Sequence, residues 1–307
     1  MMQKRRVLFR HRFEYFMFVA FIFIIKLSPR FLFNLNKKLL CALFRKFGKK
    51  HSRIIDKNLE IAFPGIDGEE LAALKGNIYN HFATIFLENI YLYARKKPQK
   101  ILKDITVNRI DILESALKKE KGIILFSGHF GNWELIPYIL SRHLQRRITS
   151  IAREMNNPLV ERVILKFREY MGSDIIYKKG SMRTILNLLK KNNIVLLLID
   201  QNTVVREGVF VDFFSQKVSA VTSVSQLHLK KKIPIVPAFL HYEKKKIVLD
   251  ILDEIQFNGG GNHGDDVKKL TQECTTMIEH QIRQHPEQWF WFHNRWKTKP
   301  PEGRRQP

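Results

Sequence analysis

The stretch Lys121–Tyr138, read KGIILFSGHFGNWELIPY, constrains the fold more than any other part of the chain. It opens with a short apolar run, Ile123–Phe126, of the kind that forms a buried strand, and Ser127-Gly128 follows as a turn signal. From Asn132 onward, apolar residues recur at helical spacing. A strand end, a tight glycine turn and a helix start make a good place for chemistry, because the turn carries side chains out of the sheet and the helix offers unpaired N–H groups.

His129 stands directly after this turn, and Glu134 lies five residues further on. A neutral imidazole can take a proton from a hydroxyl when its other nitrogen is held by a partner, and a carboxylate can also stabilise the imidazolium that forms. We therefore expect His129 to be a general base and Glu134 to orient it. The alternative is a loop histidine satisfied by ordinary hydrogen bonds. A second H-x4-[DE] match, His51/Asp56, lacks a preceding strand and is interpreted as a decoy.

The charge of the chain is extreme and unevenly spread. The formal net charge is +24 over 307 residues, and residues 1–60 hold 15 Lys and Arg against three acidic residues. Such a field attracts nucleic acid, an anionic membrane surface, or acidic protein and lipid partners. No nucleic-acid-binding motif accompanies the basic stretches, so we expect no nucleic-acid partner. Cys41 and Cys274 have no metal or redox spacing and are expected to be ordinary buried residues.

The N-terminal region predicts a membrane anchor. Residues 1–12 are basic, Phe16–Ile25 is apolar without interruption, and more basic residues follow. A full span needs about 20 apolar residues, and no small-residue cleavage site follows the run, so an uncleaved anchor is expected. It would cross as a short or tilted span or lie in the interface; a buried soluble helix is the alternative. We therefore divide the chain into an anchor, 1–33, and a second domain, 34–307.

Beyond the anchor, helices come first and strands follow. Residues 35–97 are expected to be helical, and the basic positions from 37 to 50 form either a surface against anionic lipid or an ordinary solvated face. Strand and helix then alternate from 121 to 240. After Ile123–Phe126, strands are expected at Ile148–Ile151, Asp174–Tyr177, Ile194–Ile199, Pro234–Leu240 and Lys246–Ile251, with helices at 159–171, Ser181–Lys191, Ser219–Lys230 and Asp265–His285 and a loop at Thr203–Lys217.

This alternation predicts an α/β fold with a largely parallel or mixed sheet flanked by helices. Ligands of such sheets bind at the carboxyl ends of the strands. His129, Arg153 and Asp200 each follow a predicted strand and are expected to share a site there. The sequence has no phosphate-binding glycine loop, no metal-ligand cluster and no G-x-S-x-G nucleophile motif. We therefore expect no cofactor and no metal. A serine acyl-enzyme is not favoured, and a reaction with His129 as a direct base needs no protein nucleophile.

Three further stretches carry a family resemblance together with HFGNWE at 129–134. They are KNLEIAFPGIDGEEL at 57–71, AREMNNPL at 152–159 and PEQWFWFHNRWKTKP at 286–300. In this order and spacing they resemble the late acyltransferases of lipid A biosynthesis, the lauroyl/myristoyl transferase family. The similarity extends over nearly the whole chain, and the C-terminal motif is its most specific part. The H-x4-[DE] box is shared more broadly with the glycerolipid acyltransferases, whose fold is the α/β fold expected above.

The resemblance implies a membrane-bound acyltransferase on the cytoplasmic face of the inner membrane. It would move a fatty acyl chain from acyl carrier protein to a hydroxyl of a Kdo-containing lipid A precursor. His129 would deprotonate that hydroxyl and Glu134 would orient the imidazole. Arg153 would hold a phosphate or the oxyanion. Asp200 would have a supporting role in the site or a role in substrate binding.

For Arg153 and Asp200, the alternative is an ion pair that caps the sheet. Arg295 and Lys297 would meet the phosphates or sugar acids of the acceptor, or would merely be charge at the membrane surface. The three tryptophans of the C-terminal motif are expected either to pack in the core or to anchor the protein at the membrane interface. They are Trp289, Trp291 and Trp296. Acylation of another glycolipid or of a lysophospholipid is the alternative activity, and a non-enzymatic basic protein that binds a membrane surface or nucleic acid is the alternative of a different class.

Overall fold

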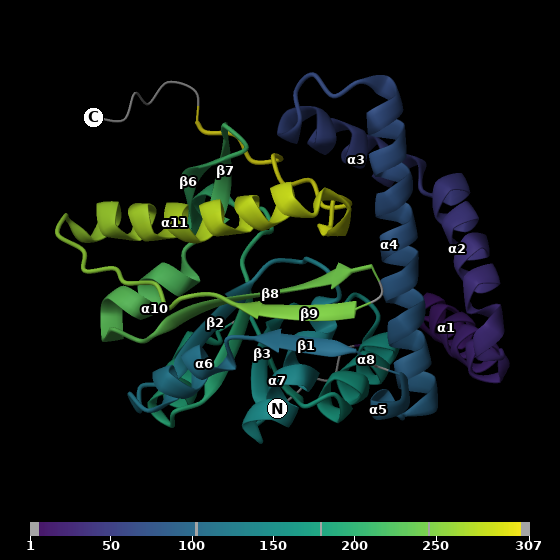
Figure 1. The fold of residues 1–307 in the computed structure, drawn as a ribbon, viewed down its shortest axis with the longest axis horizontal. Helices are drawn as coiled ribbons and strands as arrows, with labels where there is room; N and C mark the ends of the chain where they lie inside the picture. The colour runs from purple at the N-terminus through teal and green to yellow at the C-terminus, as the bar shows by residue number, and fades with distance from the viewer. Residues whose placement is uncertain (1–5, 102–103, 179, 245, 302–307) are drawn as a thin grey trace.

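The computed structural model describes residues 6–101, 104–178, 180–244 and 246–301, and its centre is a seven-stranded sheet (Figure 1). The strand order is β1-β9-β8-β2-β5-β3-β4; β8 and β9 are antiparallel and all other neighbours are parallel. The predicted α/β class with a largely parallel sheet is therefore confirmed. The strands are β1 Ile105–Asn108, β2 Ile123–Ser127, β3 Ile148–Ala152, β4 Ser173–Tyr177, β5 Ile194–Leu198, β8 Ile235–Glu243 and β9 Lys246–Ile251.

Helices cover both faces of this sheet, which explains why its central strand β2 is apolar from Ile123 to Phe126. Ile124 and Phe126 of β2 face one hydrophobic cluster, and Ile123 and Leu125 face the other. The longer helices are α1 Phe9–Leu27, α2 Phe33–Phe47, α3 Lys49–Ala62, α4 Gly68–Arg95, α8 Pro158–Tyr170 and α11 His263–Gln284. The shorter ones are α5 Pro98–Ile101, α6 Ile110–Leu117, α7 Ile136–Leu144, α9 Met182–Lys190 and α10 Ser223–Lys231, with 3₁₀ turns η1 Arg30–Leu32, η2 Trp133–Leu135, η3 Val205–Glu207 and η4 Pro286–Gln288.

A β-hairpin replaces part of what the sequence predicted as loop and helix. Strands β6, Gly208–Phe213, and β7, Gln216–Val221, pair antiparallel, and α10 begins only at Ser223. The predicted loop at Thr203–Lys217 and helix start at Ser219 are therefore wrong. Alternate hairpin side chains, including Val211 and Phe213, pack into the core beside the C-terminal tryptophans. These alternate side chains are buried beside the distant C-terminal segment. This tertiary packing favours strands over the helix that the local pattern predicted.

The N-terminal helices form a separate layer around the long helix α4. Helices α1 and α2 pack against α4, and α1 also contacts α8 (Figure 1). Their outer faces expose large apolar side chains, among them Phe16 of α1 at 68% and Leu35 of α2 at 62% exposed. Within the described residues, no helix is both long and apolar enough to cross a membrane. The anchor, its division at residues 33 and 34, and the choice between span and interface therefore remain predictions.

Candidate active site

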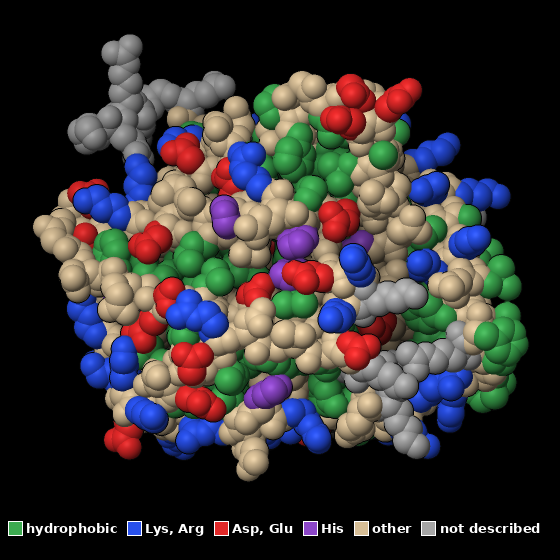
Figure 2. Space-filling model, viewed as in Figure 1, with side chains coloured by type: hydrophobic (Ala, Val, Ile, Leu, Met, Phe, Trp, Pro, Cys, Tyr) green, Lys and Arg blue, Asp and Glu red, His purple; other side chains and the backbone are tan. Residues whose placement is uncertain are grey.

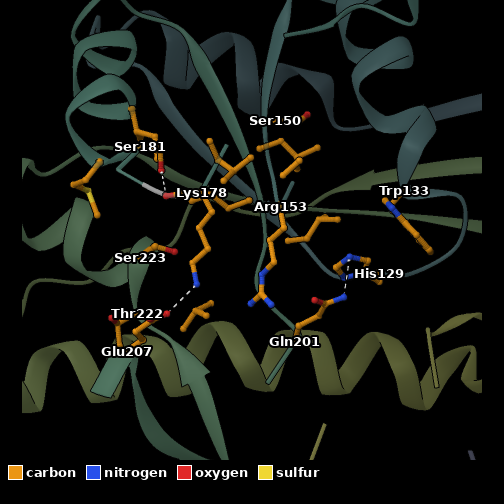
Figure 3. Close-up of a pocket in the computed structure, with 18 of the residues that line it drawn as sticks. His129, Trp133, Ser150, Arg153, Lys178, Ser181, Gln201, Glu207, Thr222 and Ser223 are labelled. Carbon is orange, nitrogen blue, oxygen red and sulfur yellow. Dashed lines mark hydrogen bonds and ion pairs between the residues drawn. The ribbon is translucent and has the colours of Figure 1, made fainter. Parts of the chain in front are cut away.

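Three parallel neighbours in the sheet bring the predicted site residues to one edge. Strands β2, β5 and β3 lie side by side in that order. They end at Ser127, Leu198 and Ala152, directly before the segments that carry His129, Asp200 and Arg153. His129 and Arg153 line the same cavity at this edge (Figure 3), as the sequence predicted. Asp200 does not pair with Arg153, because it is buried and turned toward His129.

His129 and Asp200 form a hydrogen-bonded dyad. His129 Nδ1 lies 2.7 Å from Asp200 Oδ1, and the His129 backbone N–H donates to Asp200 Oδ2 over 2.9 Å. A carboxylate at Nδ1 accepts that proton and leaves the lone pair on Nε2. Nε2 lies 3.3 Å from the side-chain nitrogen of Gln201, which also lines the cavity. The ring is thus held in the tautomer that a general base requires, with its basic nitrogen toward the cavity.

The charge on Asp200 is stabilised although the side chain is buried. Its second oxygen accepts a hydrogen bond of 2.7 Å from Trp289 Nε1. Burial on its own raises the pKa of Asp200, but the nearby His129 and the hydrogen bonds from His129 and Trp289 outweigh burial and lower the pKa to about 2. Asp200 is therefore ionised at neutral pH and can stabilise a positive imidazolium.

The C-terminal segment fixes the backbone of the loop that carries His129. Phe290 N–H donates to the His129 carbonyl over 3.0 Å, and Gly131 N–H donates to the Gln288 carbonyl over 2.9 Å. Gly131 has φ +53°, and a Cβ there would lie 1.9 Å from the Leu240 carbonyl oxygen. The motif at 286–300 thus holds the loop that carries His129. Trp289, Trp291 and Trp296 are all buried, which confirms the predicted core role.

Glu134 does not orient His129. Its carboxylate binds Arg168 of α8 through two hydrogen bonds, with Nε at 2.8 Å and Nη2 at 2.5 Å. Burial on its own raises the pKa of Glu134, but Arg168 outweighs it and holds the pKa below its usual range. In this structure the carboxylate that holds the His129 ring is therefore that of Asp200, and the contact predicted between Glu134 and the ring is not formed. The physical reason is that Glu134 sits in a 3₁₀ turn against α8, whereas Asp200 follows the strand next to β2.

Two cavities meet beside the dyad. The first, about 870 Å³, lies at the strand ends and is lined by charged and hydroxyl side chains as well as apolar ones. The second, about 830 Å³, is an apolar groove between α1, α2, α4 and α8. We call them the polar cavity and the apolar groove. Both are lined by Trp133, Glu134 and Ile164, so they adjoin at the end of the H-x4-[DE] box.

The two basic residues predicted in the C-terminal motif do not line either cavity. Arg295 is buried, donates to the Ser219 carbonyl over 2.7 Å and lies over the Phe213 ring. Burial lowers its pKa to about 10. The expected contact of Arg295 with the acceptor is therefore wrong in this structure, because the side chain is enclosed by the hairpin. Lys297 is exposed outside both cavities, and its predicted role stays a prediction.

The decoy pair is also separated. Asp56 binds Lys75, while the His51 ring lies 6.3 Å from that of Phe292 and lines the apolar groove. Both cysteines are buried, as predicted.

Some site residues gave no signal in the sequence. Arg168 lies on the polar side of an ordinary amphipathic helix, 34 positions after its partner Glu134. Trp289, whose indole binds Asp200, lies 89 positions after it in the chain. A tryptophan in an aromatic-rich motif is normally interpreted as a core residue. Gln201 could have been noted, since it directly follows Asp200 at the end of a predicted strand.

The family model described as bacterial lipid A biosynthesis acyltransferase matches residues 2–298. The chain belongs to this family. It is 24% identical over 262 residues to the lipid A biosynthesis palmitoleoyltransferase of Escherichia coli, covering 84% of this chain and 83% of the relative. It is 22% identical over 259 residues to the lipid A biosynthesis lauroyltransferase of the same organism, covering 83% and 82%.

A relative with a different acceptor in its name has a similar identity over a shorter part of the chain. The chain is 23% identical over 206 residues to the phosphatidylinositol mannoside acyltransferase of Mycobacterium tuberculosis, covering 66% of this chain. The match spans 63% of that relative's own length. The names of these three relatives therefore refer to more than one glycolipid, and each name is that of an acyl-transferring enzyme.

Proposed function

We propose that this family member transfers a fatty acyl chain from acyl carrier protein to a hydroxyl of a Kdo-containing lipid A precursor. The observation that carries the proposal is the His129–Asp200 dyad, at 2.7 Å, beside the junction of a polar cavity and an apolar groove. Transfer of this kind requires a base next to one place for an apolar chain and another for a polar headgroup. The family and the names of the Escherichia coli relatives support the class of acceptor.

His129 acts as the base in the proposed reaction. Its Nε2 takes the proton of the acceptor hydroxyl as the hydroxyl oxygen forms a bond to the thioester carbonyl carbon. Asp200 stabilises the imidazolium. The carbon–sulfur bond then breaks, and the departing sulfur takes the proton from His129, so that an ester and a free thiol result. Glu134 and Arg168 hold the wall between the two cavities in this scheme and do not exchange protons.

The apolar groove receives the acyl chain. Its lining is formed mainly by aliphatic and aromatic side chains of four helices, including Phe18, Leu43, Ile85 and Val163. Burying a methylene group stabilises binding by about 0.8 kcal/mol, so a groove of this size favours a long chain. The groove leads from the dyad to the helices whose outer faces are apolar.

Those outer faces form the proposed membrane contact, on the cytoplasmic side of the inner membrane. Large apolar side chains gather at the right edge of Figure 2, where α1 and α2 lie, with Lys and Arg side chains above and below them. An interfacial helix binds through buried apolar area and through basic residues near anionic lipid. Replacing exposed Phe16 and Phe23 with glutamate should release the protein from anionic vesicles, whereas the same changes at exposed Val204 and Val205, which line neither cavity, should not. Equal binding of both variants would contradict this contact.

The direct test of the activity is transfer of a radiolabelled acyl chain by purified protein. The donors are acyl carrier protein and coenzyme A thioesters, and the acceptors are Kdo-lipid IVA, phosphatidylinositol mannoside and lysophosphatidic acid. We expect transfer from the carrier protein to Kdo-lipid IVA. Because the chain has a +24 charge and the carrier protein has an acidic face, the KM for the carrier should rise with salt.

Acylation of a different glycolipid is the second candidate. The observation that favours it is the similarity to the phosphatidylinositol mannoside acyltransferase, at 23% identity. Efficient transfer only to phosphatidylinositol mannoside or lysophosphatidic acid would retain the His129 chemistry and remove the lipid A assignment. Absence of transfer to every acceptor would contradict the proposed activity itself.

A further inference from the structure

The polar cavity continues away from His129 into an arm that the transfer chemistry does not use. Figure 3 shows Arg153 between His129 and Lys178, with both basic side chains directed into the same cavity. Arg206 of η3 lines this cavity too, although it comes from a segment more than 50 positions from Arg153. Three basic side chains from three separate segments therefore line the polar cavity. Glu207, which follows Arg206 in the chain, pairs with Lys178, so we call the part of the cavity near Arg153, Lys178 and Arg206 the basic arm.

The charges that line the polar cavity do not cancel. Its lining includes four basic side chains, Arg153, Arg168, Lys178 and Arg206, and two carboxylates. Glu134 binds Arg168, and Glu207 lies 3.2 Å from the Lys178 ammonium. In the described part of the chain, no carboxylate lies within ion-pair distance of Arg153 or Arg206. Two positive charges in the basic arm are thus left for a ligand.

The surroundings suit a doubly charged anion with several oxygens. A phosphate monoester carries about −1.5 to −2 charges and three acceptor oxygens. Arginine side chains match such oxygens in pairs, and a lysine with one carboxylate partner still has donors to offer. The hydroxyls of Thr222 and Ser223 lie on the same side of the cavity as Lys178 (Figure 3). The arm is open to water, since Lys178 and Glu207 are 44% and 47% exposed, so a headgroup can enter it.

We propose that the basic arm binds a phosphate monoester carried by the acceptor, and that Arg153 and Arg206 hold it with help from Lys178. This inference rests on the proposed function, because it assigns a binding site to the headgroup of the same acceptor. The phosphate fixes the headgroup at one end of the polar cavity and thereby directs the hydroxyl toward His129. A phosphate ester is also present in the prosthetic arm of carrier-protein thioesters, but as a diester with a single charge, which leaves one of the two arginines without a partner.

The first experiment measures binding without catalysis. Glucosamine 1-phosphate, inorganic phosphate and glucosamine are titrated into the full chain and followed by ³¹P NMR or calorimetry. We expect the two phosphates to bind wild type and glucosamine not to bind. Arg206→Gln should weaken phosphate binding about tenfold, as expected for one lost charge-assisted hydrogen-bond pair near solvent. Lys190→Gln, which removes an exposed positive charge outside the cavity, should bind like wild type.

The second experiment uses steady-state transfer to separate the two sources of phosphate. For Arg206→Gln we expect the acceptor KM to rise about tenfold, with kcat and the donor KM unchanged, and Arg206→Lys to recover part of the loss. An acceptor without its phosphate monoester should be used equally by wild type and Arg206→Gln. A rise in the donor KM alone would assign the arm to the donor and overturn the proposal.

The binding experiment keeps this inference distinct from the proposed activity. If no acceptor is acylated but glucosamine 1-phosphate binds wild type and fails to bind Arg206→Gln, the activity is wrong and the phosphate site stands. If transfer occurs but Arg206→Gln and Lys190→Gln behave alike in both experiments, the phosphate site is wrong and the activity stands.

Discussion

The polar cavity and the apolar groove adjoin at Trp133 and Glu134, yet they are built in different ways. In the polar cavity, hydrogen bonds fix the atoms of the proposed base: Asp200 holds the His129 ring, and Trp289 holds Asp200. In the groove, the walls are apolar faces of α1, α2, α4 and α8, which pack by shape and volume. The polar cavity should therefore be sensitive to single atoms, and the groove to the volume of a side chain.

This difference sets the size of the effects that substitutions should have. Removing one nitrogen or oxygen in the polar cavity removes a proton acceptor or leaves a buried group without its partner. A larger side chain in the wall of the groove only shortens the space that is left for an acyl chain. The predictions below use this contrast, and each would be wrong if the two regions responded alike.

The largest effect should come from the base. His129→Ala should lower kcat about 10²- to 10⁴-fold, the usual contribution of a general base, while circular dichroism and unfolding stay close to wild type. His143→Ala, an exposed histidine at the end of α7, is the matched control and should leave kcat unchanged. Near-normal turnover by His129→Ala would exclude the mechanism proposed here.

The next effect concerns the groove and should depend on the donor. Val163→Phe adds volume to a groove-lining position of α8, so it should lower kcat/KM for the longest accepted chain about tenfold, since each excluded methylene costs about 0.8 kcal/mol. Short chains should be used as well as before. Leu165→Phe, on the same helix but outside the groove lining, should not change the preference. An equal loss for all chain lengths would argue that the groove does not hold the acyl chain.

The sequence predicted the edge of the sheet well and the hydrogen-bonded partners poorly. Strand runs such as Ile194–Leu198 and the residues just after them can be located from local pattern, and the parallel arrangement then brings His129 and Asp200 together. The choice between Glu134 and Asp200 as partner of His129 is different. It depends on Arg168, which binds Glu134 from another helix, and on the exact register of β2 against β5. Neither fact has a local signal.

The N-terminal layer shows the same limit from another side. The apolar run Phe16–Ile25 predicted a helix, and α1 confirms it. Which of its faces packs on α4 and which is left exposed depends on tertiary contacts that alternate along the helix, with Ile22 and Ile25 buried and Phe23 and Ile24 exposed. The sequence pattern of such an apolar helix is the same whether its second face packs against protein or contacts lipid.

The smallest effect should come from the indole that supports Asp200. The lowered pKa of Asp200, about 2, means that its ionised form contributes stability above its unfolded pKa of about 4, and that this stability is lost as the pH falls toward 2. Trp289→Phe removes one hydrogen bond to that carboxylate, so the folded pKa should rise.

The loss of unfolding free energy between pH 5 and pH 3 should then be smaller than in wild type, by about 0.2 kcal/mol, because most of the titration of folded Asp200 lies below pH 3. Urea unfolding at the two pH values measures it. Trp296→Phe is the control, because that indole faces the Phe213 carbonyl and not a carboxylate. The same pH dependence in Trp289→Phe and wild type would show that the indole does not stabilise the charge.

The central claim is that Asp200, and not Glu134, acts with His129. Single-turnover rates in two double-mutant cycles test it most directly. In one cycle Asp200→Asn is combined with His129→Ala; in the other, Glu134→Gln and Arg168→Gln are changed together, so that no buried charge is left unpaired, and are combined with His129→Ala. We predict that Asp200→Asn slows transfer about 10²- to 10⁴-fold in the parent and hardly at all once His129 is absent, whereas any loss from the Glu134 and Arg168 pair is the same in both backgrounds. The reverse result, with the Glu134 pair coupled to His129 and Asp200 independent of it, would contradict the account.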